Sequence, residues 1–215
     1  MALSSELLAA LVASLIGVVQ LYLRRAQRRE IGEGDRLPAA MRRQHSIENT
    51  LQDLCGKVGG ARAMLLACHN GGARPKPGGQ YYVSCRAEFA DTPHIERQRS
   101  SFQKVPIYDP AYLNLIVRLQ EENFLTFQTE DLPEDSWLRG VYAADEVKSS
   151  AVAEVVRKSD EYFYLAIQFV DEVEEFSPAT RGHIQATAGR IRHFLRDLND
   201  PNTAPPVPGS GESAH

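Results

Sequence analysis

The sequence predicts an α+β domain in which one antiparallel sheet carries the first and last helices on the same face, preceded by one transmembrane helix. Three observations predict it. An uncharged apolar run opens the chain, amphipathic helical stretches begin and end the remainder, and runs typical of strands lie between them. With 215 residues, 43% of them hydrophobic and 24% charged, the composition fits one globular domain and excludes a disordered or disulfide-scaffold chain.

Residues 1–23 predict a transmembrane helix. The stretch 7–23 reads LLAALVASLIGVVQLYL, has no charge, and spans about 25 Å as a helix, near the lower limit for a bilayer. A buried core helix is rarely apolar on every side over this length. A cleaved signal peptide would have positive charge before the apolar run, where the only charged side chain is Glu6. We therefore expect a single-pass membrane anchor.

Arginines after the apolar run orient the expected anchor. Because positive charge is retained in the cytoplasm, we expect the N-terminus outside and the C-terminal domain on the cytoplasmic side of the inner cell membrane. Residues 24–36 form the predicted basic juxtamembrane connector, whose arginines can contact lipid phosphates without selecting one lipid. The expected membrane-interface residues are Tyr22, Arg24, Arg25, Arg28 and Arg29.

The cysteines and the charge distribution indicate which kinds of site and partner the chain lacks. The three cysteines, Cys55, Cys68 and Cys85, form no C-x-x-C pair, so neither a disulfide framework nor a metal site is predicted. The net charge is -4, with much of the positive charge beside the anchor. We therefore expect no nucleic acid partner.

The first half of the remaining chain predicts a helix and then two strands. Apolar residues recur at helical spacing over 37–58, until Gly59-Gly60 ends the pattern. Strands are predicted at 63–69 and 80–89, with a turn at Asn70-Gly71-Gly72 after the first. The helical stripe consists of Leu37, Met41, Ile47, Leu51, Leu54 and Val58.

The second half predicts a helix, an irregular segment, a hairpin and a last helix. Asp109-Pro110 opens the middle helix, residues 124–142 read as irregular, and 151–157 with 162–170 form the hairpin. Ser177-Pro178 opens the last helix, and residues 199–215, rich in Pro, Gly and Ser, form a predicted disordered tail. The expected apolar stripes are Leu113, Ile116, Val117 and Gln120 in the middle helix, and Ile184, Ala188, Ile191, Leu195 and Leu198 in the last.

This order of elements over residues 37–198 resembles a GAF domain, a small sensor module related to PAS domains. The closest local match is residues 150–156 and 162–170 with Phe176-Ser177 leading into the helix at Thr180. The stretch His69-Asn70-Gly71-Gly72 is similar to one in membrane-tethered bacterial and phage GAF-like proteins of unassigned function. The Asn-Lys-x-Asp-Glu motif of cyclic-nucleotide-binding GAF domains is absent, as is an evident bilin-attachment cysteine.

A pocket between the sheet and its covering segments is expected, since ligand sites are concave and mostly apolar with a few polar groups. Each candidate also has a structural reading: His69 and Asn70 can cap a turn, and the aromatic residues can be core. The predicted ligand-binding residues are His69, Asn70, Tyr82, Arg86, Phe127, Trp137 and Gln168.

No catalytic motif such as G-x-S-x-G or H-E-x-x-H occurs, so we expect a non-enzymatic sensory or binding protein that recognises a small ligand or a protein partner, with no cofactor. The resemblance also implies a possible homodimer through residues 37–58 and 178–198. Two alternatives stay open. One is a thiol-dependent reductase of the free methionine sulfoxide type, and the other is a purely structural membrane-tethered dimerisation module.

Overall fold

The computed structural model describes residues 37–71, 79–91, 102–158, 160–171, 173 and 175–196. The chain divides into two units, Met1–His45 and Ser46–His215, and only residues 37–45 of the first are described. The expected transmembrane helix, the basic connector with its interface residues, and the tail lie outside the described residues. Among the residues that are described, no helix has the length and apolar composition needed to cross a bilayer.

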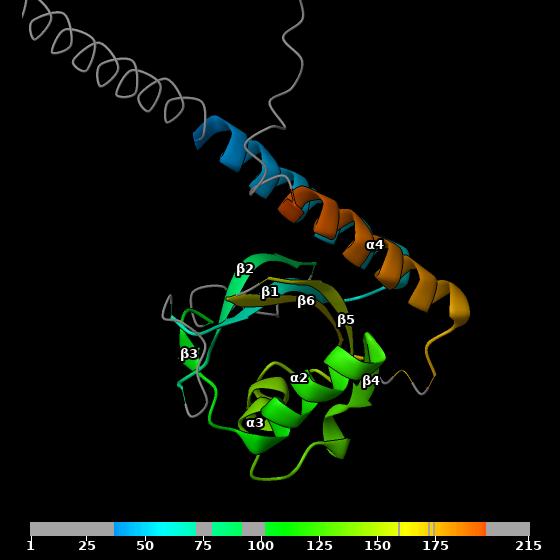
Figure 1. Ribbon diagram of the computed structural model, residues 1–215. Coiled ribbons are helices and arrows are strands. Elements are labelled where there is room, and N and C mark those ends of the chain that lie inside the picture. The colour runs from blue at the N-terminus through cyan, green and yellow to red at the C-terminus, as the bar shows by residue number, and fades with distance from the viewer. Residues whose placement is uncertain are drawn as a thin grey trace, which may run out of the picture. The chain divides into compact units, whose positions relative to one another are not determined.

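A six-stranded antiparallel sheet forms the centre of the second unit, with strand order β3-β2-β1-β6-β5-β4 (Figure 1). The strands are β1 (Arg62–His69), β2 (Tyr82–Ala90), β3 (Val105–Pro106), β4 (Phe124–Gln128), β5 (Ser149–Arg157) and β6 (Glu161–Phe169). In β1, Ala63 and Leu65 join the core on one face, while Met64 and Leu66 join the core on the other. The sheet is therefore covered on both faces, which explains why β1 reads as a continuous apolar run.

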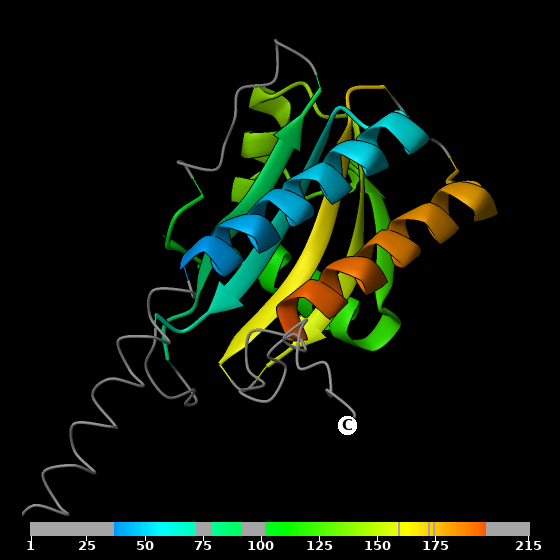
Figure 2. The same cartoon turned by 90° about the horizontal axis from the view of Figure 1, so that it is seen from above.

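From residue 46 onward, the first helix lies side by side with the last helix on one face of the sheet (Figure 2). A helix covers residues 37–58, and its part from residue 46 onward belongs to the second unit with α4 (Pro178–Arg196). Both helices bury part of the apolar stripe that the sequence predicted. Leu37 and Met41, expected in the first stripe, are instead 67% and 64% exposed, and Leu198 of the last stripe lies outside the described residues. The buried residues are Ile47, Leu51 and Leu54 in the first helix and Ile184, Ala188, Ile191 and Leu195 in α4.

The opposite face carries α2 (Pro110–Glu122) and α3 (Trp137–Ala144), which lie beneath the sheet in Figure 1. Their buried side chains pack against the residues of β1, β5 and β6 that point to this face. The prediction that residues 124–142 are irregular is wrong. It contains β4, a short 3-10 helix, η1 (Thr129–Asp131), and α3. These elements are short and depend on tertiary partners, since β4 pairs with β5 along its whole length.

The apolar stripe predicted for α2 is only partly the buried one. The helix buries Tyr112, Leu115, Ile116 and Leu119. Leu113 and Val117, which were expected on the same apolar face as Ile116, are 41% and 53% exposed. The helix therefore has a second apolar stripe, turned away from the core, and this stripe lines the cavity described next.

Candidate functional site

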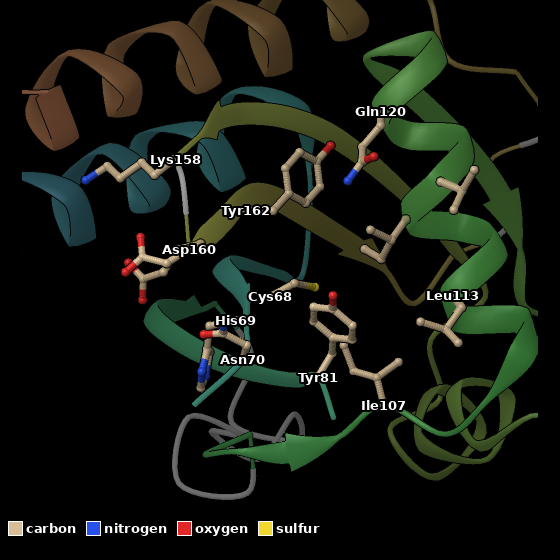
Figure 3. A pocket seen from close by; sticks show the side chains of 13 residues that line it. Cys68, His69, Asn70, Tyr81, Ile107, Leu113, Gln120, Lys158, Asp160 and Tyr162 are labelled. Carbon is tan, nitrogen blue, oxygen red and sulfur yellow. The ribbon is translucent and has the colours of Figure 1, made fainter. Parts of the chain in front are cut away.

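A cavity of about 340 Å³ lies where β1 ends, β2 begins and the β5–β6 turn reverses the chain, with α2 as its side wall (Figure 3). Segments that are distant in sequence meet here because antiparallel pairing brings the end of β1 next to the starts of β2 and β6. The lining residues are Cys68, His69, Asn70, Tyr81, Ile107, Leu113, Ile116, Val117, Gln120, Lys158, Asp160, Glu161 and Tyr162.

The wall of the cavity is apolar. Leu113 and Val117 of the second stripe line it together with buried Ile116, and Ile107, from the segment after β3, lies near Leu113 (Figure 3). Tyr162 faces the cavity from β6, and its hydroxyl donates to Glu154 Oε2 at 3.2 Å. The pKa of Tyr162 is raised, and burial is the largest cause. The hydroxyl therefore stays protonated and acts as a neutral hydrogen-bond donor.

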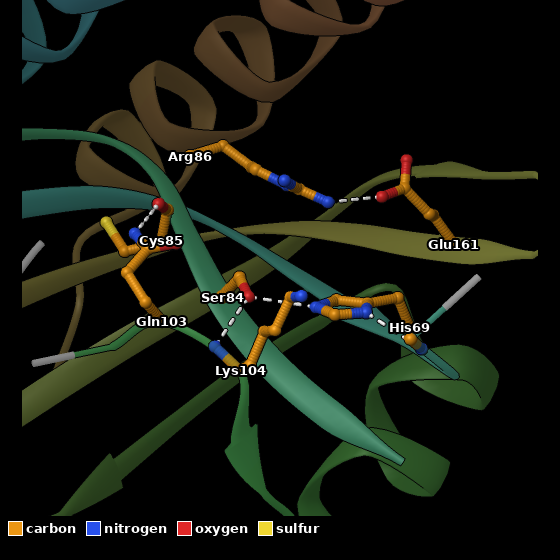
Figure 4. A network of polar contacts seen from close by, with 8 residues as sticks. His69, Ser84, Cys85, Arg86, Gln103, Lys104 and Glu161 are labelled. Atoms are coloured by element: carbon orange, nitrogen blue, oxygen red, sulfur yellow. Dashed lines mark hydrogen bonds and ion pairs between the residues drawn. The ribbon is translucent and has the colours of Figure 1, made fainter. Parts of the chain in front are cut away.

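His69 fixes the polar rim at the end of β1 through both ring nitrogens. The backbone N–H of Gly71 donates to His69 Nδ1 at 3.1 Å, so Nδ1 is an acceptor and the proton of the neutral ring is on Nε2. Nε2 then donates to Ser84 Oγ at 2.8 Å, and Ser84 Oγ also accepts from the backbone N–H of Lys104 at 3.0 Å (Figure 4). One imidazole thus joins β1, β2 and the segment before β3.

The pKa of His69 is lowered. Burial is the largest cause, and the positive charge of Arg86 adds to it, while Glu161 opposes it. The lowered pKa agrees with the hydrogen bonds, because a proton on Nδ1 would confront the Gly71 N–H. His69 is therefore a neutral residue whose two nitrogens are already used, and its role at the cavity is to hold the rim in place.

The charged residues at the mouth are held by neighbours. Arg86 forms an ion pair with Glu161 (Figure 4). Lys158 donates to the backbone oxygen of Leu195 at 3.3 Å, and its ammonium lies 5.3 Å from the centre of the Phe163 ring. These contacts reduce the net electrostatic preference of the mouth and leave the apolar wall as its dominant property.

Cys55 and Cys68 are poor nucleophiles in this structure. All three cysteines are free, and Cys68 lines the cavity. Burial raises the pKa of Cys55 and of Cys68 to about 12 in each case, so both are protonated at neutral pH. Because the thiolate is the reactive form, this environment does not favour thiol chemistry. Within the described ranges, no group of three or more His, Cys, Asp or Glu side chains could hold a metal ion.

The structure brings four of the seven predicted ligand-binding residues together at the rim. His69 and Asn70 line the cavity directly. Tyr82 stacks on His69 with ring centres 5.9 Å apart, and Arg86 reaches the rim through its ion pair with Glu161.

The other three lie elsewhere. Phe127 stacks on Tyr142 with ring centres 5.9 Å apart. Gln168 is buried and accepts a hydrogen bond from Arg62 Nε at 2.6 Å. Trp137 lines a separate cavity of about 150 Å³.

The region beneath residues 124–142, which covers the α2 face of the sheet, is almost filled. A cavity of about 10 Å³ lies there, close to the volume of one water probe. It is surrounded by large side chains that include Tyr112, Tyr142 and Tyr164, and the hydroxyls of Tyr112 and Tyr164 are hydrogen bonded to each other. The larger cavity lies instead at the strand ends.

Sequence reasoning missed several lining residues of that larger cavity. Tyr81 and Ile107 lie next to β2 and β3, and no local sequence pattern predicts that these two strands pair. Residues 158–161 were predicted only to form a turn. One sign was present in the sequence. Gln120 shares a face with three apolar residues of α2, and a polar residue at that position fits the edge of a cavity better than a core.

Comparison with known proteins identifies the fold. No protein-family model matches the sequence, and no curated protein matches it. Solved structures do match. The GAF domain region of a Geobacter sulfurreducens PCA protein is 10% identical, with a TM-score of 0.52 over 75% of this chain and 97% of that one.

Two further similar structures are also GAF domains. The blue-light absorbing form of the Thermosynechococcus elongatus PixJ GAF domain is 12% identical, with a TM-score of 0.51 over 75% of this chain and 93% of that one. The phycocyanobilin-bound GAF domain from a cyanobacterial phytochrome is 15% identical, with a TM-score of 0.52 over 75% and 91%. At these identities the likeness concerns the fold alone, and it shows that the described domain has the GAF-like fold that the sequence predicted.

Proposed function

We propose that this chain is a membrane-anchored, non-enzymatic binding protein whose GAF-like domain takes a small, mostly apolar molecule into the cavity at the strand ends. The second apolar stripe of α2 carries the proposal. Leu113 and Val117 face the cavity instead of the core, at a site of about 340 Å³. Small-molecule sites typically have volumes of about 300 to 1,000 Å³.

The energetics favour an apolar ligand. Fully burying one Val or Leu side chain contributes about 1.5–3 kcal/mol, so a ligand that covers Leu113 and Val117 gains a useful part of its affinity from them. Asn70 and Gln120 add amide groups at the edge, which can orient a polar end of the ligand. The phycocyanobilin-bound phytochrome domain is a case in which this fold holds a small molecule.

The thiol environment supports a binding role. Cys55 and Cys68 have pKa values raised to about 12, so neither supplies the thiolate that a reductase needs at neutral pH. The nearly filled region beneath residues 124–142 favours the purely structural alternative. The open cavity at the strand ends favours binding instead.

Ligand binding is tested by extracting the purified full chain and identifying the released small molecules by mass spectrometry. Val117→Asp places a carboxylate against the apolar wall, and we expect it to reduce the recovered ligand by roughly tenfold or more, because desolvating a charge costs more than ~1.4 kcal/mol. Asn114→Asp is the matched control, since it adds the same charge to an exposed position of α2 outside the cavity lining. Equal recovery from both variants would place any ligand elsewhere.

Membrane anchoring is tested separately by alkaline extraction of cell membranes. We expect the full chain to stay in the membrane pellet, and the variant Leu15→Arg/Val18→Arg to be released, because two charges near the middle of the apolar run oppose insertion. Release of the unaltered chain would contradict the anchor without affecting the ligand site.

A further inference from the structure

A second feature lies beside the cavity and is not explained by it. Exposed aromatic residues gather around the start of α2: Tyr108 is 73% exposed and Trp137 39%. Together with Pro106 they line the cavity of about 150 Å³, which shares Ile107 with the larger one. Tyr81, also exposed, lines the larger cavity together with Ile107. We name Tyr81, Pro106, Tyr108 and Trp137 the aromatic surface.

Trp137 is held rigidly while its ring stays accessible. Its ring centre lies 5.5 Å from that of Phe102 and 6.0 Å from that of Tyr112, the latter in an edge-to-face arrangement. No described residue accepts a hydrogen bond from its indole N–H. The exposed apolar part of this ring is costly to leave in water, its N–H can donate to a partner in place of water, and such tryptophans are typical centres of binding surfaces.

This combination suits a polyproline II segment. Such a segment has no internal hydrogen bonds, so its carbonyls accept from side-chain donors, and its proline rings pack into aromatic-lined grooves. Aromatic side chains around a small cavity, with an indole N–H beside them, match both requirements.

The chain carries a segment of this chemistry in its own tail. Residues 204–208 read APPVP, in which Pro205 and Pro208 have the P-x-x-P spacing. The last described helix lies on the other face of the sheet, and its end reaches the edge at which the cavity opens, because Lys158, a lining residue, donates to the backbone oxygen of Leu195. From Arg196, nine residues reach Pro205, and in an extended proline-type conformation they span about 28 Å.

We infer that residues 204–208 dock on the aromatic surface of the same molecule. A short linker gives the tail an effective concentration on the order of 1 mM, so even an intrinsic Kd of about 100 µM leaves roughly nine-tenths of the surface occupied. The inference does not depend on a ligand in the larger cavity. A docked tail does, however, lie next to that cavity at Ile107.

The test uses the intrinsic fluorescence of Trp137, which is the only tryptophan of the chain. In the full chain we expect Trp137 to be protected from acrylamide. In Pro205→Ser/Pro208→Ser we expect a red-shifted emission maximum and a larger quenching constant. Ser210→Ala/Ser213→Ala, in the same tail, is the matched control and should behave as the unaltered chain. A synthetic peptide of residues 202–210, added at several hundred µM, should restore protection to the proline variant.

A second variant separates docking from a fold defect. Tyr108→Ala removes an exposed ring, so we expect unchanged thermal unfolding but the same increase in quenching as in the proline variant. Equal quenching of the unaltered chain and the proline variant overturns the inference. Protection that rises with protein concentration assigns the surface to a second copy, and protection that appears only with lipid vesicles assigns it to the membrane. Either result overturns docking within one molecule.

Discussion

Ser136 donates a hydrogen bond to Oδ2 of Asp109 at 2.7 Å, and this bond joins the first turns of two helices. Asp109 is the N-cap of α2, where its Oδ1 accepts from the backbone N–H of Ala111 at 2.9 Å. Its Oδ2 also accepts from the backbone N–H of Leu138 in α3 at 3.4 Å. Burial, the largest single cause, raises the pKa of Asp109, but these hydrogen bonds together outweigh it and leave the pKa below its usual value.

Asp109→Ala is expected to lower the free energy of unfolding by about 2–3 kcal/mol, because one side chain serves the ends of two helices and a single cap contributes about 1 kcal/mol. Asp109→Asn should cost less, since an amide oxygen still accepts one of the bonds. Urea denaturation of the full chain measures both. Asp135→Ala, at an exposed position close by, is the control, and an equal loss in that variant would show that the effect is not due to capping.

His69 predicts a pH dependence of stability. Its pKa in the folded protein lies below the ordinary value of 6.5, so the unfolded chain takes up a proton first as the pH falls. The stability that depends on neutral His69 is therefore fully present above pH 6.5 and is lost as the pH falls from there toward the lowered pKa. His69→Gln should flatten this part of the profile in urea titrations above and below pH 6.5. His183→Gln, at an exposed position of α4, is the matched control for the replacement of one histidine.

The buried guanidinium of Arg62 predicts unequal costs for its two ends. Arg62 is fully buried, its Nη2 lies 2.6 Å from Asp145 Oδ2, and its Nε donates to Gln168. Asp145→Ala leaves a buried charge without its carboxylate and is expected to cost about 3–5 kcal/mol, whereas Arg62→Met replaces the charge by an apolar chain and should cost less. Thermal unfolding compares the two. Glu122→Ala breaks the exposed pair Arg118–Glu122 and should change stability by less than about 1 kcal/mol.

The expected homodimer is tested at the start of the first helix. Leu37 and Met41 lie one helical turn apart and are exposed. Leu37→Asp/Met41→Asp should weaken self-association of the full chain by about tenfold or more in sedimentation velocity, because each buried apolar side chain contributes about 1.5–3 kcal/mol. Ala39→Asp, about 160° away from Met41 around the helix, is the control. Unchanged association in the double variant would exclude these residues from the interface.

Most of the fold was predictable because each long helix or strand has a recognisable pattern in its own sequence. The stripes of the first helix and of α4 and the run in β1 reflect burial along their whole length. β3 could not be found, since its two residues form a strand only by pairing with Tyr82 and Val83. α3 was missed because its eight residues include Gly140, which weakens a helical pattern. The membrane anchor stays a prediction.

The candidate site was predictable only in part, for a related reason. His69 and Asn70 were found because a polar pair at the end of an apolar strand has a local signature. The stripe with Leu113 and Val117 was also visible, but it was assigned to the core. Periodicity tells which residues share a face of a helix, and only the tertiary arrangement tells what that face meets.

The coverage of the outer side of β2 limits how other chains can attach. The N–H of Cys85 donates to the backbone oxygen of Phe102 at 2.6 Å. The carbonyl of Cys85 accepts from Gln103 Nε2 at 2.8 Å (Figure 4). Farther along, Pro106 in β3 has no N–H to offer a neighbour. Strand addition, the usual route to amyloid-like stacking, therefore finds little free backbone between Tyr82 and Cys85. This stretch is therefore protected against edge-to-edge aggregation, which matters most for the membrane-anchored chain proposed above.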